Sequence, residues 1–214
     1  QTAAACRDWI SIQEALGAVG NDLSVLIATP DAPLIVPEAL EVLTYRKKLK
    51  LNNTTVFSYL MNNYWDTNYK ASQSGSISFR YALTSVSGRA KDSDIVNFGQ
   101  DTALPMPALW VDKPAGGSGA KAAISFISVP QDNVRILGVK TSEDGKGITV
   151  RLQEMDGKAG EVRLGINPAL KITSAQRTNL VEVPLKKLAV AKSGGMVTVS
   201  DRIGARGLLT IVLK

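Results

Sequence analysis

The sequence predicts an all-β fold in two domains, and three observations lead to this prediction. A chain of 214 residues with 44% hydrophobic content is large enough to bury two modest cores. Short segments in which apolar and polar residues alternate are typical of strands with one buried face. Turns rich in glycine, proline, asparagine and aspartate separate these segments. We expect the boundary near Pro130, which gives domains at 1–130 and 131–214.

The C-terminal domain contains six predicted strands. In Ile148–Glu154, apolar Ile148, Val150 and Leu152 alternate with polar residues and so share one face. The other five strands are expected at Val134–Lys140, Glu161–Ile166, Leu180–Leu185, Met196–Ser200 and Leu208–Leu213. The Asp-Gly pairs at 144–145 and 156–157 favour tight hairpin turns, because both residue types tolerate a positive φ. Short alternating strands of this number predict a small immunoglobulin-like β-sandwich.

The N-terminal domain is less regular. Its strands are expected at Leu23–Thr29, Thr55–Met61, Ser76–Leu83 and Ala122–Val129. A short helix is expected only over Pro37–Leu43 or Ser93–Gly99. The glycine-rich segment 113–119 predicts a surface loop rather than a phosphate-binding loop, because no Gly-Lys-Ser/Thr sequence follows it to open a helix.

The chain contains no histidine, which removes the usual general base near neutral pH and the commonest zinc ligand. Chemistry would therefore need carboxylates, lysine or tyrosine. The acidic pairs Asp92 with Asp94 and Glu143 with Asp144 are interpreted as turn and loop residues, because the spacing of a calcium loop is missing. Cys6 has no histidine to activate it. We therefore predict no catalytic residue, no metal site and no cofactor in this chain.

Charge and hydropathy bear on possible partners. The formal net charge is +6, but the densest basic segment is the single short run Tyr45–Lys50. A nucleic-acid footprint would gather positive charge on one face, so we predict no nucleic-acid partner. No apolar stretch reaches the length of a membrane span, and none is predicted.

The segment Met61–Tyr69 is the strongest candidate for a binding site. It gathers three aromatic residues and several amide or hydroxyl side chains in a chain with only 6% aromatic residues. Sugars pack their C–H faces on aromatic rings and bind Asn and Asp through their hydroxyls. A structural corner, in which the rings fill a core and the asparagines cap a turn, explains the same composition.

Several motifs resemble glycoside hydrolase family 38, the α-mannosidases. The clearest are Thr55–Tyr69 and Gly75–Tyr81, which resemble the C-terminal β region of that family. Further matches follow the same order along the chain: Pro30–Leu34, Leu137–Gly145, Val150–Leu152, Thr178–Glu182 and Leu208–Leu213.

The resemblance implies an architecture of a catalytic α/β barrel, a helical bundle, a large β-sandwich and a small terminal β-sandwich. Residues 1–130 would form the end of the large sandwich, and 131–214 the small one. Retaining hydrolysis of α-mannosides, with an Asp nucleophile and a zinc ion held by His and Asp, would belong to the barrel in the missing N-terminal domains. The resemblance places Asn63, Trp65 and Asn68 as candidate substrate-binding residues.

We therefore expect a non-catalytic region that scaffolds and docks the missing barrel, with free sheet edges or an apolar docking face. Whether the chain has any activity of its own stays open at this point. One alternative is a stand-alone carbohydrate-binding module, which predicts exposed coplanar aromatic rings and affinity for free mannosides. A second is a small complete enzyme, which requires a pocket with converging carboxylates.

Overall fold

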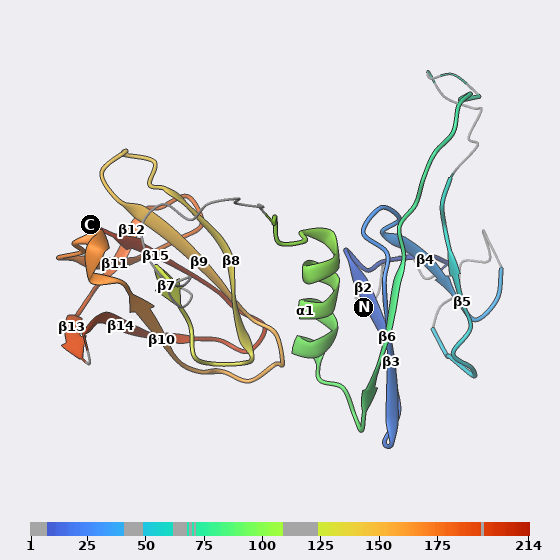
Figure 1. The fold of residues 1–214 in the computed structure, drawn as a ribbon, viewed down its shortest axis with the longest axis horizontal. Helices are drawn as coiled ribbons and strands as arrows, with labels where there is room; N and C mark the ends of the chain where they lie inside the picture. The colour runs from blue at the N-terminus through green and yellow to red at the C-terminus, as the bar shows by residue number, and fades with distance from the viewer. Residues whose placement is uncertain are drawn as a thin grey trace, which may run out of the picture. The chain divides into compact units, whose positions relative to one another are not determined.

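A computed structural model of the chain describes residues 8–40, 49–61, 68, 70, 72–108, 124–193 and 195–214. Strands account for 44% of the structure and helices for 9%, and the strands form four sheets, so the predicted all-β class is confirmed. The chain divides into two compact units, Gln1–Ala108 and Leu109–Lys214 (Figure 1). Each unit is described by itself below.

The first unit contains two antiparallel three-stranded sheets and one helix. The strands are β1 (Ile10–Ser11), β2 (Ala15–Val19), β3 (Leu23–Ala28), β4 (Leu34–Pro37), β5 (Val56–Ser58) and β6 (Ala82–Ser87), and the helix is α1 (Asp92–Ala103). The sheet orders are β1-β4-β5 and β2-β3-β6. The strand predicted at Ser76–Leu83 begins later, at Ala82, and the strand predicted at Thr55–Met61 is limited to β5.

Helix α1 packs on β2 and β3 at two glycines. A Cβ atom on Gly17 would lie 2.7 Å from Cδ1 of Ile95, and a Cβ on Gly99 would lie 2.7 Å from Cβ of Ala15. Only glycine permits this approach of helix to sheet. The helix expected at Ser93–Gly99 is confirmed and is longer than predicted. The prediction that Asp92 and Asp94 are loop residues is wrong, because both lie in the first turn of α1, where Asp94 accepts a hydrogen bond from the main-chain N–H of Lys91 (2.8 Å).

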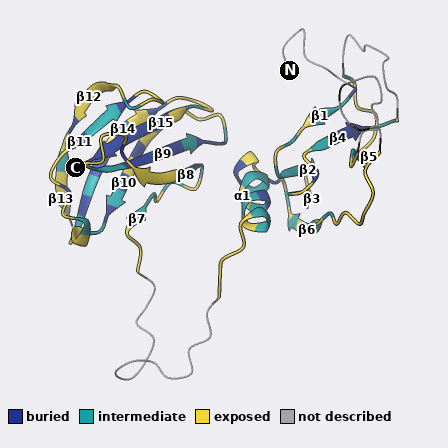
Figure 2. Cartoon of the chain, turned by 90° about the horizontal axis from the view of Figure 1, so that it is seen from above, coloured by how far each residue is buried: buried dark blue, intermediate teal, exposed yellow. Residues whose placement is uncertain are grey.

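The second unit is a β-sandwich of two antiparallel sheets. Its strands are β7 (Ile127–Ser128), β8 (Val134–Thr141), β9 (Ile148–Glu154), β10 (Gly160–Ile166), β11 (Ala175–Thr178), β12 (Pro184–Leu188), β13 (Val190–Ser193), β14 (Met196–Ile203) and β15 (Leu208–Leu213). One sheet has the order β13-β14-β10-β7 and the other β12-β11-β15-β9-β8. Figure 2 shows buried residues gathered along the central strands of this unit. The domain boundary predicted near Pro130 stays a prediction, and β7, which precedes it, pairs with β10.

The core of the sandwich lies between its sheets. The registers put Val150 opposite Ile211 and Leu152 opposite Leu209 in one sheet, and Leu164 opposite Val199 in the other. These side chains are all buried, as the alternation of the sequence predicted. The short helix η1 (Pro168–Leu170) follows β10.

One predicted strand of this unit is wrong. Leu180–Leu185 does not form a single strand, because residues 179–183 form the turn between β11 and β12. The side-chain oxygen of Asn179 accepts hydrogen bonds from the N–H groups of Val181 (3.1 Å) and Val183 (2.9 Å), and Glu182 has φ = 63°. These bonds close a turn where the alternation of apolar residues favoured a strand.

A buried glutamate joins three turns at one end of the sandwich. Glu154 is 1% exposed, and its carboxylate accepts hydrogen bonds from Nδ2 of Asn133 and from the N–H groups of Asp156 and Arg206. Burial alone would raise the pKa of this carboxyl, but the donated hydrogen bonds outweigh it and lower the pKa to about 2. Glu154 therefore stays ionised and holds these turns together.

Candidate carbohydrate-recognition site

The three predicted substrate-binding residues lie in or beside a part of the chain that the structure does not describe. Asn63 and Trp65 lie outside the described residues, whereas Asn68 is an exposed residue in a bend. Their role in sugar binding stays a prediction. The structure does describe the two stretches that lead into and out of this segment, 56–61 and 72–81. In Figure 1 these are the cyan chain that continues β5 and the green chain that runs into β6.

The stretch that enters the segment is fixed on the sheet β1-β4-β5. Ser58 lies opposite Ile35 of β4, and the N–H of Tyr59 donates to the carbonyl of Leu34 (3.0 Å). The ring of Tyr59 packs against that of Trp9, with centroids 6.2 Å apart and planes tilted by 51°. The tilt is typical of aromatic pairs in a packed cluster. It does not give the coplanar rings that a stand-alone carbohydrate-binding module would present.

The stretch that leaves the segment is fixed by an ion pair between Asp31 and Arg80. Nε, Nη2 and the main-chain N–H of Arg80 all donate to the Asp31 carboxylate, each at 2.9 Å. These hydrogen bonds, those of the side chain first, lower the pKa of Asp31 to about 2. Asp31 is therefore an acceptor at neutral pH and has no proton to donate as a general acid.

A hydroxyl pair joins the two stretches directly. The phenolic oxygen of Tyr81 lies 2.7 Å from Oγ of Ser58, and Tyr81 remains 48% exposed. Three sequence motifs thus meet in one place: the segment of Asp31, the strand of Ser58 and the segment of Arg80 and Tyr81. Sequence analysis selected all three motifs by resemblance but had no signal for these contacts.

The arrangement is suited to holding a loop and supplying hydrogen bonds. The two stretches that flank segment 62–69 are joined where they meet β5 and β6, and an exposed tyrosine hydroxyl and an exposed guanidinium lie at that junction. Such groups recognise sugar hydroxyls, whereas hydrolysis needs two carboxyl groups flanking the scissile bond. The described contacts bring only Asp31 to this place, and Arg80 occupies it.

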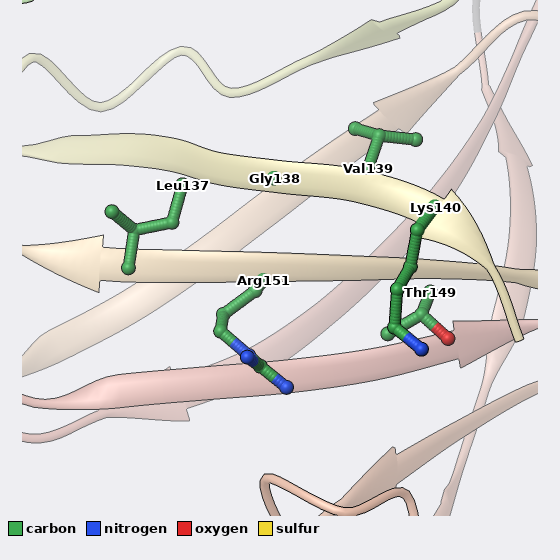
Figure 3. Close-up of a pocket in the computed structure, with 6 residues that line it drawn as sticks. All are labelled: Leu137, Gly138, Val139, Lys140, Thr149 and Arg151. Carbon is green, nitrogen blue, oxygen red and sulfur yellow. The ribbon is translucent and has the colours of Figure 1, made fainter. Parts of the chain in front are cut away.

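A second surface feature is a shallow pocket of about 350 Å³ on β8 and β9. Its described lining comprises Leu137, Gly138, Val139, Lys140, Thr149 and Arg151. In Figure 3 the side chains of Leu137, Lys140 and Arg151 extend to one side of β8, and that of Val139 to the other. None of these six residues is a carboxylate, so they offer no acid or base pair.

The cations of this pocket already have partners in the protein. Nη2 of Arg151 donates to the carbonyl of Leu180 (2.7 Å), and Nζ of Lys140 lies 2.7 Å from Oε1 of Glu182. Hydrogen bonds from Lys140 and from the N–H of Glu143 lower the pKa of Glu182. The pocket therefore lies beside a turn that these contacts hold on the sheet, and the charge of Lys140 is paired with a carboxylate, whereas Arg151 is bound by a neutral carbonyl.

Two searches of the described residues concern metals and membranes. Among the residues that the structure places, no group of three or more His, Cys, Asp and Glu side chains is arranged to hold a metal ion. No helix in the described ranges is long and apolar enough to cross a membrane.

The topology and core of the second unit define an antiparallel β-sandwich domain. A family model described as the glycosyl hydrolases family 38 C-terminal beta sandwich domain matches residues 133–206. The match begins immediately before β8 and ends in the turn that precedes β15. Over these residues the chain is similar to that family of domains, so the resemblance drawn from the sequence is confirmed for this part of the chain. No curated protein matches the chain.

Proposed function

We propose that this chain is the C-terminal β region of a family 38 glycosyl hydrolase and that it supports a catalytic barrel without performing the reaction itself. The single observation that carries the proposal is the match of residues 133–206 to the C-terminal sandwich domain of that family. The parent reaction is retaining hydrolysis of α-mannosides. Its zinc ion and nucleophile belong to the N-terminal domains, which are the main partner of this chain.

The lack of histidine supports the non-catalytic role independently of the family. Two of the carboxylates with a lowered pKa, Asp31 and Glu154, accept hydrogen bonds from Arg80 and from three turns respectively. Each serves as a hydrogen-bond acceptor in the structure, so neither is available as a nucleophile or a general acid.

We further propose that segment 62–69 contributes to sugar recognition in the intact enzyme through Asn63, Trp65 and Asn68. The joining of the two stretches that flank it supports this role. Asp31 with Arg80 and Ser58 with Tyr81 close the base of the loop that carries the segment, and a closed loop has less conformational entropy to lose when it contacts a ligand.

Reconstitution tests the proposal. The barrel-containing N-terminal part of the parent and the present chain would be produced separately and mixed, and hydrolysis of a nitrophenyl α-mannoside would be followed with zinc present. We expect each part to be inactive or weakly active alone and the mixture to recover activity. Tight binding of free mannosides to the present chain in calorimetry would instead favour a stand-alone carbohydrate-binding module.

A further inference from the structure

We propose that the groove between the two sheets of the first unit binds an uncharged, apolar β-strand that pairs with the free edge of β2. The inference rests on the proposed function, because the strand would come from the N-terminal part of the parent. It deepens that function by assigning the surface through which this chain docks and the chemistry of its partner.

The groove has a volume of about 500 Å³, and its lining within the described residues is uncharged. Ile10, Ile35, Pro37 and Val56 from the sheet β1-β4-β5 form one side, and Leu16, Gly17, Ala18 and Val19 of β2 form the other. Residues 51–55 complete the described lining with one leucine and four amide or hydroxyl side chains. In a chain that is 21% charged, none of the thirteen described lining residues carries a charge, which favours an apolar occupant over an anionic one. They also include no aromatic ring on which a sugar would stack.

The side of β2 that faces the groove is apolar and incompletely buried. Gly17 contacts helix α1, so Leu16 and Ala18, its neighbours in the strand, point to the opposite face. That face continues onto β3 through Ile27, which pairs with Leu16, and onto β6 through Leu83, which pairs with Ile27. Leu83 is 71% exposed. An apolar occupant would remove this surface from water.

The free edge of β2 identifies the occupant as a strand. Thr29 N–H donates to the carbonyl of Glu14 (2.7 Å), and Gly20 N–H donates to that of Leu23 (3.1 Å). Hydrogen-bonded pairs alternate in an antiparallel ladder, so Leu16 and Ala18 direct their main-chain groups toward β3. Ala15, Gly17 and Val19 then direct theirs to the other edge. In the sheet order of the described residues nothing pairs with that edge.

Groove and edge together match the two requirements of β-strand addition. Main-chain hydrogen bonds to β2 provide affinity, and alternate side chains of the added strand enter the groove. The lining specifies that those side chains are apolar and that charged ones are rejected, because a charge there would be desolvated without a partner. Free strand edges are usually protected in folded proteins, which is consistent with a covered edge in the parent.

Two variants of the 214-residue chain test the inference in binding to the N-terminal part of the parent. Ala18→Glu places a charge in the groove, and Val19→Pro removes a main-chain N–H from the free edge. We expect each to weaken the complex at least about tenfold, since a desolvated charge or a lost edge bond costs more than about 1.4 kcal/mol. Leu185→Glu, at an exposed position of the second unit, is the matched control and leaves affinity unchanged.

Hydrogen exchange of the wild-type chain gives a readout that does not depend on the folding of variants. Binding should slow exchange at the amides of Ala15, Gly17 and Val19 in particular. Undiminished affinity of both variants, or unchanged exchange at these amides in a complex that does form, would overturn the docking site while leaving the proposed function intact. If the wild-type chain forms no complex, the proposed function fails and the inference fails with it.

Discussion

The carboxylate of Asp31 accepts three hydrogen bonds from Arg80, which lies 49 residues further along the chain. The contact fixes the end of the stretch that returns from segment 62–69, just before β6 begins at Ala82. Because one of the three donors is the main-chain N–H of Arg80, the pair fixes the backbone and not only two side chains. The pair therefore ties the backbone that enters β6 to the turn that precedes β4.

Replacement of Asp31 by asparagine should release this stretch. Asp31→Asn removes the charge and turns an N–H₂ group toward the Arg80 donors. We expect the Arg80 amide to exchange its hydrogen about tenfold faster, as the loss of one hydrogen bond predicts. The exposed Asp22→Asn is the control. An unchanged exchange rate at Arg80 would show that the ion pair does not order the backbone.

Acid should weaken the second unit through Glu154. Its pKa is about 2 in the folded chain, against an ordinary 4.5. A lowered folded-state pKa gives stability that is fully present above about pH 4.5 and is lost as the pH falls toward 2. The lowered pKa values of Asp144 and Glu182 act in the same direction.

The variant Glu154→Gln separates this contribution from the others. At pH 7 it should lower the free energy of unfolding of the second unit by about 1–3 kcal/mol, because it weakens several buried hydrogen bonds. Its stability should also fall less steeply between pH 4.5 and 2 than that of the wild type. Denaturant titration at several pH values, with hydrogen exchange of the β9 amides as the readout, measures both effects. If the stabilities of the variant and the wild type fall in parallel with pH, Glu154 is not the source of the acid sensitivity.

The burial of side chains in the sandwich predicts that two leucines of the second unit contribute very differently to its free energy of unfolding. Leu152 is fully buried and Leu185 is 61% exposed. Leu152→Ala should cost about 2–5 kcal/mol of unfolding free energy, since it removes apolar contacts and leaves a cavity. Leu185→Ala should change it by no more than about 0.5 kcal/mol. Similar losses for the two would contradict the assigned core.

The packing of α1 predicts that substitution by valine destabilises the chain at one glycine and not at another. Gly99→Val places a Cβ 2.7 Å from that of Ala15, and overpacking of this kind costs about 1–3 kcal/mol. A small gain in helix propensity offsets only part of this cost. Gly138→Val meets no atom within 4 Å of its Cβ and serves as the control in denaturant titration. Equal stability of both variants would show that α1 does not approach β2 so closely.

Replacement of the lysine at the end of η1 by glycine should stabilise the second unit. Lys171 is exposed and has φ = 52°, a conformation that costs a side-chain-bearing residue about 1–2 kcal/mol. Relief of this strain stabilises the folded chain, but glycine also has more conformational freedom in the unfolded chain, which offsets about 0.4–1 kcal/mol of the stabilisation. Lys171→Gly should therefore stabilise the second unit by up to about 1 kcal/mol. Lys187→Gly, in the exposed strand β12, should destabilise the second unit. If both variants change the free energy of unfolding in the same direction, Lys171 does not have the left-handed backbone conformation.

The sequence predicted the second unit better than the first for a physical reason. Strands such as β10 and β14 have one buried and one more exposed face, so the alternation of apolar and polar residues marks them. The turns between strands are marked by Asp-Gly pairs, because these residues tolerate the backbone conformation of a tight turn. Residues 179–183 show the limit of this signal, because Leu180, Val181 and Val183 resemble a strand. Hydrogen bonds from the N–H groups of Val181 and Val183 to the side-chain oxygen of Asn179, and the contact of Glu182 with Lys140, determine the structure there.

The candidate site was predicted only as a segment. Composition selected 61–69, and resemblance added the motifs of Asp31 and Arg80, but the contacts between them depend on tertiary folding. The groove beside β2 had no sequence signal at all. Its small and apolar residues look like ordinary strand residues until the register shows which edge is free.

The central claim is that the reaction takes place elsewhere in the parent. Its most direct test is the rate at which the purified 214-residue chain hydrolyses a nitrophenyl α-mannoside with zinc present, compared with the intact parent at equal concentration. We predict turnover by the parent and none by the chain above the rate of buffer alone. Turnover by the chain that survives repeated purification would contradict the claim.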